Sequence, residues 1–425
     1  MAGGLIVVAF FVLMLLGIPM AFSLSLAALF YIAVFVDVPS IIIAQQLISG
    51  VDKFTLMAVP FFIVAGSLME FGGISKRIVG LSRSVVGTLP GGMAAVTVVS
   101  SMIFAAMTGA GAATTAAVGS IMIPAMCDEG YDIDFACGLQ ATAGIFGPLI
   151  PPSVLMVLYG ITAGVSVGDM LLAGLLPGVF LGLLLITTVV FMCVRKGYKG
   201  KGSFSFRGVA KAFADSFFAI LAPVIILGGI YSGVFTPTEA AGITCFYSLG
   251  VGLFIYREIQ FRSVGQIMFK SFKLAAGIML IVGSTQAFGW VLSRERIPQA
   301  VALGFNSIIG TPAVFLLAVC LMLLVAGCFI DAVPALLILA PILVPVAASY
   351  NISLIHFGVV MVVTLCIGLV TPPVGINLFV ASSVAHRPVH KIIPKLPPFI
   401  VAMVIGMFTV VLFEPLSLFL VNLNK

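Results

Sequence analysis

Charged side chains are scarce in this chain. Only 8% of its 425 residues are Asp, Glu, Lys or Arg, whereas 62% are hydrophobic and the mean hydropathy is +1.30. A soluble domain carries about 25% charged residues, and no soluble fold of this length could bury so much apolar surface. The composition therefore excludes a soluble protein. It predicts an all-α polytopic membrane protein, because helices satisfy their own backbone hydrogen bonds within the bilayer.

Motifs of several other protein classes are also missing. The seven cysteines form no C-x-x-C pair, and the three histidines have no metal-ligand spacing, so we expect no metal centre. No Walker A motif is present, so we expect no ATP bound to this chain. The apolar segments hold too few His and acidic residues for acid–base chemistry, which argues against an enzyme. The net charge of +6 reports loop positions in a membrane protein and does not indicate nucleic-acid binding.

The most informative feature is a Pro-Pro pair that occurs twice, 221 positions apart. The two segments are Gly147-Pro-Leu-Ile-Pro-Pro152 and Gly368-Leu-Val-Thr-Pro-Pro373, each in the middle of an apolar stretch. Proline removes a backbone donor and clashes with the preceding turn, so each pair predicts unwound backbone. Such backbone is tolerated at membrane depth only where it is buried in protein or lines a cavity. Paired interruptions in two halves of a membrane protein indicate a transporter's binding site.

Each Pro-Pro helix follows an apolar segment that is too long for one helix and is interrupted by small residues. We expect two repeats, each with a connector, a re-entrant helical hairpin and a broken helix. The expected organisation is scaffold helices in 1–72, a first repeat in 73–163 (hairpin 90–127, broken helix 132–163), scaffold helices in 164–292 with a basic loop at 195–212, a second repeat in 293–385 (hairpin 312–348, broken helix 354–385) and a C-terminal part in 386–425. Single helices are expected near 3–17, 19–36, 54–71, 170–194, 216–232, 240–256, 266–292 and 397–421.

Lys and Arg positions predict the topology. With the connector that carries Lys76, Arg77 and Arg83 in the cytoplasm, 16 of the 20 Lys and Arg residues fall inside. Those left outside are Lys53, Arg294, Arg296 and Lys425. This agrees with the positive-inside rule. It places the N-terminus outside and gives the two repeats opposite orientations, which is the inverted repeat of many secondary transporters.

Two clusters of small and hydroxyl residues mark the hairpin tips and the helix breaks. Half-helix C-termini and unwound carbonyls can hold Na⁺, and half-helix N-termini favour an anionic substrate. The alternative is that small residues only allow tight helix packing. The first cluster is Ser100, Ser101, Thr108, Gly109 and Gly111 with Gly147 and Ser153, and the second is Gly327, Asp331 and Pro334 with Gly368 and Thr371.

Three further features involve charged side chains. Asp331 is a rare carboxylate at apparent membrane depth, where it could bind a cation, carry a proton or cap a half-helix. Glu239 lies at an expected outer loop, with a helix-start role or a gating role as alternatives. Arg294 and Arg296 are expected at the outer face, either solvated or docking a partner.

Several motifs closely resemble the large membrane subunit, DctM-like, of the tripartite ATP-independent periplasmic (TRAP) transporters. They are Pro60-Phe-Phe-Ile-Val-Ala-Gly-Ser-Leu-Met-Glu70, Gly72-Gly-Ile-Ser-Lys-Arg77, Leu89-Pro-Gly-Gly92, Gly147-Pro-Leu-Ile-Pro-Pro-Ser153 and Gly368-Leu-Val-Thr-Pro-Pro-Val-Gly-Ile-Asn-Leu-Phe379. The resemblance covers essentially the whole chain. One departure is the first tip, where many relatives have serines and this chain has Thr108-Gly-Ala-Gly111.

The resemblance implies Na⁺-coupled uptake of a carboxylate by an elevator mechanism in the bacterial inner membrane. It implies two partners, a small four-helix membrane subunit and a soluble periplasmic binding protein. It also implies that Thr108, Ser153, Asp331, Thr371 and Pro373 line the substrate and ion cavity. The Na⁺ candidates are Ser100, Ser101, Gly109, Gly111, Gly147, Gly327, Asp331, Gly368 and Thr371.

Two substrates and one other function remain open. The carboxylate could be a sialic acid or a C4-dicarboxylate, and overall resemblance favours the sialic-acid type. The alternative function is a stand-alone ion-coupled carboxylate carrier of related architecture, which would transport without a binding protein.

Overall fold

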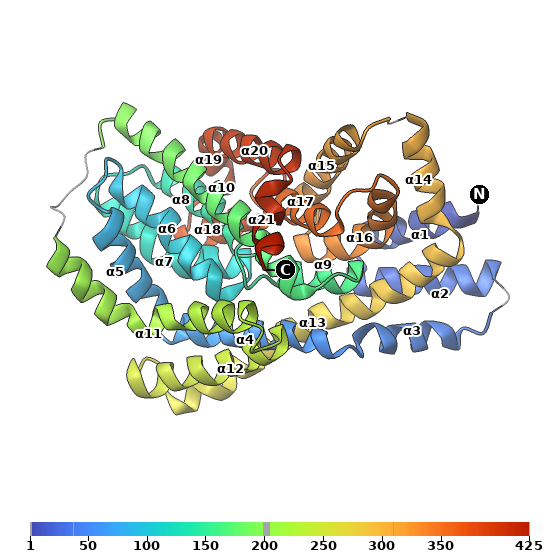
Figure 1. Cartoon of the computed structure of the whole chain (residues 1–425), viewed down its shortest axis with the longest axis horizontal. Helices are drawn as coiled ribbons and strands as arrows, with labels where there is room; N and C mark the ends of the chain where they lie inside the picture. Colours follow the sequence, from blue (N-terminus) through green and yellow to red (C-terminus); the bar gives the residue numbers. More distant parts are fainter. Residues whose placement is uncertain (1, 37, 199–204, 309, 425) are drawn as a thin grey trace.

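The computed structural model describes residues 2–36, 38–198, 205–308 and 310–424, within which every regular element is a helix. Lys199, Lys201 and Lys425, which entered the charge count, lie outside these ranges. Seven of the described helices are long and apolar enough to cross a membrane, or eight if the bent pair at Val389–Lys395 and Pro397–Leu412 is one span. The expected all-α fold is confirmed. Figure 1 shows an elongated molecule with α1–α3 at one end and α5 at the other.

The N-terminal helices are α1 (Ala2–Leu15), α2 (Met20–Phe35), α3 (Ile41–Val51) and α4 (Ala58–Phe71), with a 3-10 turn η1 (Phe54–Met57) before α4. No helix was expected at the position of α3. This helix packs along α13 (Phe261–Arg294) because two glycines permit close contact. A Cβ added at Gly283 would lie 2.8 Å from Leu47 O, and one added at Gly50 would lie 2.6 Å from Gln286 Cβ.

The two hairpins form where the small residues predicted them. After connector α5 (Ile74–Val86), α6 (Gly92–Thr108) and α7 (Gly111–Asp128) meet at a two-residue tip. In the second hairpin, α15 (Pro312–Phe329) and α16 (Ala332–Ser349) are separated by Ile330 and Asp331. The second connector is α14 (Ile297–Ile308).

Both Pro-Pro segments interrupt a helix, as expected. The first lies between α8 (Ile133–Ala143), which ends in the 3-10 turn η2 (Gly144–Phe146), and α9 (Val154–Ala163). The second lies between α17 (Leu354–Gly368) and α18 (Ile376–Ala385). The Pro151–Pro152 and Pro372–Pro373 bonds are both cis.

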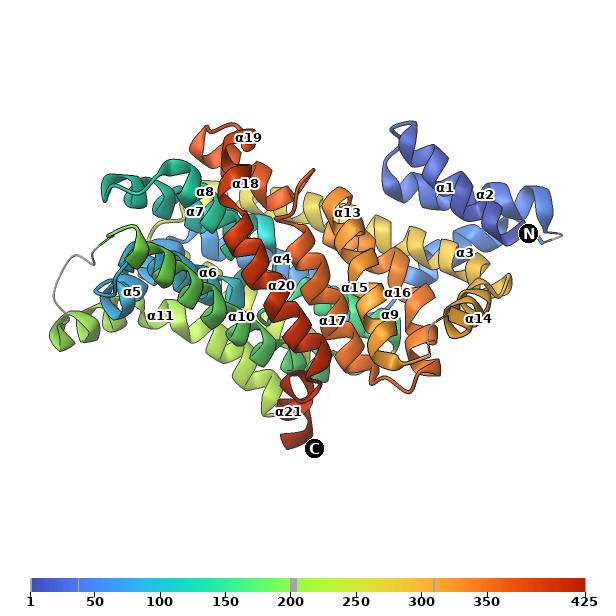
Figure 2. The same cartoon turned by 90° about the horizontal axis from the view of Figure 1, so that it is seen from above.

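Helix α10 (Val167–Arg195) packs with α6 of the first hairpin and with α9 and α17 of the broken helices, which differs from the expected scaffold grouping of 164–292. Its Gly174, Gly178 and Gly182 make room for side chains from the first repeat, namely Met156, Ile150 and Met102. Beside it lies α20 (Pro397–Leu412), which Figure 2 shows running alongside α10 and α17. The remaining scaffold helices α11 (Phe206–Tyr231) and α12 (Pro237–Gly250) pack instead on α5 and α4.

Three helix ends differ from the expectations. Helix α11 begins at Phe206, inside the basic loop expected at 195–212. A π-turn η3 (Val251–Ile255) continues α12. The helix expected at 397–421 is wrong as one element, because Phe413 adopts a non-helical conformation (φ −117°, ψ 78°) between α20 and α21 (Pro415–Leu423).

Ion pairs join the start of α8 to the chain that follows α18. Arg387 Nε donates to Asp134 Oδ1 over 2.6 Å, and Lys395 Nζ lies 2.7 Å from Asp132 Oδ2. Lys395 is the last residue of the 3-10 turn η4 (Ile393–Lys395), which follows the short helix α19 (Val389–Ile392). The hydrogen bond from Lys395 lowers the pKa of the Asp132 carboxyl, and the Asp132 carboxylate raises the pKa of Lys395. The first repeat is thereby connected to the chain that directly follows the second repeat.

Candidate functional site

Both hairpin tips and both helix breaks meet at one small cavity of about 150 Å³. The first tip contributes Gly109 to Ala112, and the second contributes Asp331 to Val333. Pro148 and Val154 flank the first break, and Leu369 and Asn377 flank the second. The opposite wall comes from outside the repeats, with Ile63 of α4 and with Leu274 and Ile278 of α13. The cavity therefore joins the two predicted clusters across one space.

The first tip is pressed against the first break. Gly109 has φ +64°, and a Cβ added to it would lie 2.6 Å from Pro152 O. Gly147 in turn contacts Ala110 O so closely that it has no room for a Cβ. Both positions require glycine, one for its conformation and space and the other for space alone. This contact brings backbone carbonyls of the first hairpin tip and of the first helix break together.

Asn377 completes this half-site with an amide from the second repeat. Its side chain is fully buried, and Nδ2 donates to Ala141 O over 3.2 Å. Its Oδ1 has no hydrogen-bond donor within the described part of the chain. A Cβ placed on Gly111 would lie 3.1 Å from this Oδ1 and 3.2 Å from Gly144 O, so the oxygens converge. A buried acceptor among carbonyls suits a hard cation, because a cation needs no donor hydrogen there.

Asn377 was not among the predicted site residues, although it lies within the second resemblance motif. The missed signal was an amide two residues after Gly375, at the start of the half-helix that follows the break. Gln140 was also missed among the predicted site residues, because it lies inside α8, where its sequence neighbours give no sign of a break.

Ser100 and Ser101 lie deeper in the first hairpin than the tip. Both are fully buried. Ser101 Oγ accepts from Gln140 Nε2 over 3.4 Å, whereas Ser100 Oγ and Gln140 Oε1 have no partner in the described structure. These polar groups form a second buried set about two turns below the tip.

The second tip is likewise in close backbone contact with the second break. A Cβ added at Gly368 would lie 2.6 Å from Gly327 Cα, and Val374 N donates to Cys328 O over 3.1 Å. Asp331 caps α16, with Oδ1 accepting from Ala332 N over 2.7 Å, while its side chain also lines the cavity. The capping role that was one alternative for Asp331 is therefore present. The capped carboxyl group remains at the cavity wall.

Several predicted site residues support the walls and do not line the cavity. Thr108 Oγ1 lies 3.0 Å from Thr114 Oγ1. Ser153 Oγ donates to Pro148 O and accepts from Met156 N, which caps α9. Thr371 Oγ1 donates to Ile367 O over 2.8 Å. Pro373 is exposed at the second break.

The three predicted docking residues lie away from this cavity. Glu239 forms a capping box with Thr236 at the start of α12, which is the helix-start role. Arg294 packs over the Trp290 ring at 5.5 Å from its centroid, and Arg296 has φ +54° in the turn before α14.

Two interrupted helices and two hairpin tips around one cavity define a multi-pass membrane protein with the architecture of a secondary transporter. The family model for the DctM component of the tripartite ATP-independent periplasmic transporter matches residues 7–416. The chain belongs to this family, and the resemblance inferred from its motifs is confirmed.

Curated relatives match over nearly the whole chain. The sialic acid TRAP transporter large permease SiaM of Vibrio cholerae is 38% identical over 411 residues, covering 97% of this chain and 96% of that one. The C4-dicarboxylate TRAP transporter large permease DctM of Pseudomonas aeruginosa is 39% identical over 380 residues, 89% of each chain. Among solved structures, the YdaH transporter of Alcanivorax borkumensis aligns with a TM-score of 0.59 at 15% identity, covering 87% of this chain and 86% of that one. That similarity supports the fold alone.

Proposed function

We propose that this chain is the permease subunit that imports an organic carboxylate together with Na⁺ by an elevator movement. The observation that carries this proposal is the shared cavity, where Asn377 Oδ1 and the backbone of Gly111 and Gly144 offer oxygens and Asp331 supplies a carboxylate. The first half-site would hold Na⁺ through neutral oxygens. The second would add a charged ligand through Asp331.

The substrate class follows from the relatives and from the site. Relatives named for sialic acid and for C4-dicarboxylates are equally similar to this chain, at 38% and 39% identity. Both substrates are organic carboxylates, and four helices begin at the cavity: α7 at Gly111, α9 at Val154, α16 at Ala332 and α18 at Ile376. Helix N-termini favour anions, so we propose a carboxylate and treat a sialic acid and a C4-dicarboxylate as the two probes.

The assembly would be that of a tripartite system in a bacterial inner membrane. A soluble periplasmic protein would deliver the substrate, and a small four-helix subunit would complete the scaffold. The charge distribution supports an N-terminus on the periplasmic side. Because α10 packs on α6 of the first hairpin and α20 packs on α15 of the second, we propose that α10 and α20 travel with the moving part.

The test is uptake by the purified complex in proteoliposomes, with its binding protein added, for N-acetylneuraminate and succinate. We expect uptake driven by an inward Na⁺ gradient and at least tenfold slower uptake when choline replaces Na⁺. Equal uptake in choline would contradict Na⁺ coupling. Full uptake by this chain alone, without binding protein, would favour the stand-alone carrier.

A further inference from the structure

A second, larger cavity of about 350 Å³ lies farther along α9, α13 and α16. These are three of the helices that line the 150 Å³ cavity at the hairpin tips, which we call the tip cavity. On α13, Ile278 lines the tip cavity, and residues from Val282 to Ser293 line the second cavity. On α16, Val333 lines the tip cavity, and residues from Leu337 to Pro345 line the second cavity. Helix α9 contributes Ile161 and Thr162. We call this space the outer cavity, because charge counting places Lys53, Thr162 and Ser293 together on the outside.

An apolar neck separates the two spaces. Val282 and Leu337 line the outer cavity one helical turn from Ile278 and Val333, which line the tip cavity. Val282 and Leu337 are both buried. Small-molecule sites measure about 300–1,000 Å³, so the outer cavity has the size of a ligand site and the tip cavity, in this conformation, does not.

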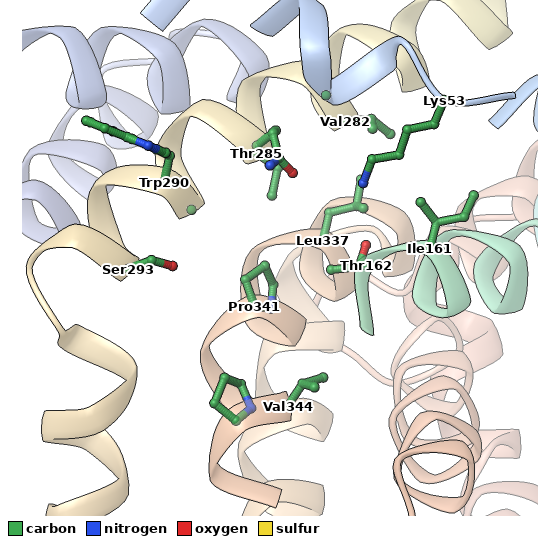
Figure 3. Close-up of a pocket in the computed structure, with 14 residues that line it drawn as sticks. Lys53, Ile161, Thr162, Val282, Thr285, Trp290, Ser293, Leu337, Pro341 and Val344 are labelled. Atoms are coloured by element: carbon green, nitrogen blue, oxygen red, sulfur yellow. The ribbon is translucent and has the colours of Figure 1, made fainter. Parts of the chain in front are cut away.

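Among the residues that the structure describes, Lys53 is the one charged side chain that lines the outer cavity. It lies in the two-residue break between α3 and η1, and Figure 3 shows its side chain extending toward Leu337 and Thr162. Within the described residues no carboxylate lies within 4 Å of its ammonium group, and its chain neighbour Asp52 does not line the cavity. An ammonium group without a carboxylate partner, in a cavity without acidic lining, favours an anionic ligand.

The hydroxyl groups nearby cannot replace Lys53 as donors. Thr162 and Thr285 both donate to carbonyls of their own helices over 2.8 Å. The side chains of Gln286 and Ser293 have no hydrogen bond in the described structure, so their amide and hydroxyl groups could contact other polar atoms of a ligand. The Trp290 ring points away from Lys53, toward α1 and α2.

We propose that the outer cavity is a waiting site for the substrate, in which the Lys53 ammonium binds the carboxylate before it passes the neck. This inference rests on the proposed function, since it names the residue that receives the carboxylate on the outer side. The ligand class is a small organic carboxylate with further hydroxyl or carbonyl groups. A charge-assisted hydrogen bond of this kind is strong enough to change affinity about tenfold.

The test measures occupancy without transport. In the purified complex, a Thr162→Cys variant is labelled with a maleimide, with the parent chain as background because five of its seven cysteines are buried. N-acetylneuraminate or succinate should slow labelling, and neutral N-acetylglucosamine should not. In Lys53→Met the half-protecting concentration should rise at least tenfold, and Lys53→Arg should restore it to within about threefold. The matched control is Lys273→Met, which removes an exposed positive charge from α13 outside both cavities.

Uptake measurements separate this inference from the proposed function. Lys53→Met should raise the KM for uptake about tenfold with an unchanged maximal rate, whereas Asp331→Asn should lose uptake but still show substrate protection of the label in the Thr162→Cys background. If the parent takes up a carboxylate with Na⁺ but Lys53→Met is protected at the parent's concentrations, the waiting site is wrong and the proposed function stands. Absence of Na⁺-driven uptake in the parent would instead overturn the proposed function.

Discussion

Asp331 combines a cap and a charge, and one substitution separates them. Asn caps a helix as well as Asp does, so Asp331→Asn should keep the hydrogen bond from Ala332 N. Its free energy of unfolding should stay within about 1 kcal/mol of the parent's. We expect uptake to fall at least tenfold, because the cavity loses its carboxylate. The matched variant is Glu239→Gln, which retains the capping box of α12 and should transport normally. Equal, near-normal uptake by both would remove Asp331 from the site.

Asn377 tests the first half-site. In Asn377→Ala, Ala141 O loses its donor and Oδ1 disappears, so we expect a stability loss of about 1–3 kcal/mol. We also expect the Na⁺ concentration for half-maximal uptake to rise roughly tenfold, the effect of losing one good ligand.

The control for Asn377 is Ser248→Ala on α12, which removes another fully buried side chain without a hydrogen-bond partner in the described structure. It should leave the Na⁺ dependence unchanged. An Asn377 variant that is less stable but has the same Na⁺ dependence would assign this residue to folding alone.

At the residue level, the sequence predicted glycine and proline positions better than polar ones. Gly109, Gly147, Gly327 and Gly368 all lie at tip or break contacts, because an interrupted helix requires small residues whatever surrounds it. The role of Asn377 depends on which oxygens of the other repeat lie beside its side chain, and only the packed structure shows these. Thr108 and Ser153 illustrate the converse, since their hydroxyl groups are used within the protein.

Among the elements, the second tip and the second break leave almost no space between their backbones. A methyl group at Gly368 would lie 2.6 Å from Gly327 Cα. Gly368→Ala should therefore lower the free energy of unfolding by about 1–3 kcal/mol and reduce the uptake rate at least tenfold. Gly228→Ala on α11 is the control, because nothing lies within 4 Å of the added Cβ and alanine favours a helix. Normal uptake by Gly368→Ala would show that this contact does not close the cavity.

The ion pairs between α8 and the turn α19–η4 predict a pH dependence. The pKa of Asp132 is lowered from 3.8, so its contribution is complete above that value and is lost as pH falls through the lower folded pKa. The pKa of Lys395 is raised from 10.5, so its contribution is complete below that value and is lost as pH rises through the higher folded pKa.

The melting-temperature difference between the parent and Lys395→Gln should therefore be constant from about pH 5 to 9. It should shrink below about pH 4 and above about pH 10.5. A difference that changes between pH 5 and 9 would mean that another titrating group controls this contact.

Element boundaries show where sequence patterns stop being informative. Helix α3 has only 11 residues, too short for a hydropathy span of about 20, and Asp52-Lys53 after it is typical of a loop. It forms because α13 offers Gly283 to pack against. The glycine stripe of α10 predicts a close neighbour but does not identify it, and only the fold shows that this neighbour is the first repeat.

For the whole molecule, the proposed movement has a direct structural test at the interface between α13 and α16. A Cβ added at Gly289 would lie 3.9 Å from Pro341 Cβ, within the range of about 3.5–4.5 Å that a disulfide requires. Gly289→Cys with Pro341→Cys should therefore form a bond between the scaffold and the second hairpin. If the hairpin must slide past α13, oxidation should stop uptake and dithiothreitol should restore it.

The control for the α13–α16 disulfide is a second disulfide inside the proposed moving part. A Cβ added at Gly178 of α10 would lie 3.7 Å from Ile150 Cβ beside the first break, and replacing Ile150 by Cys also makes room for the new side chain. Because α10 packs with the first repeat, oxidised Gly178→Cys with Ile150→Cys should keep most of its uptake. Loss of uptake there would return α10 to the static scaffold, and full uptake by the oxidised α13–α16 pair would contradict an elevator movement.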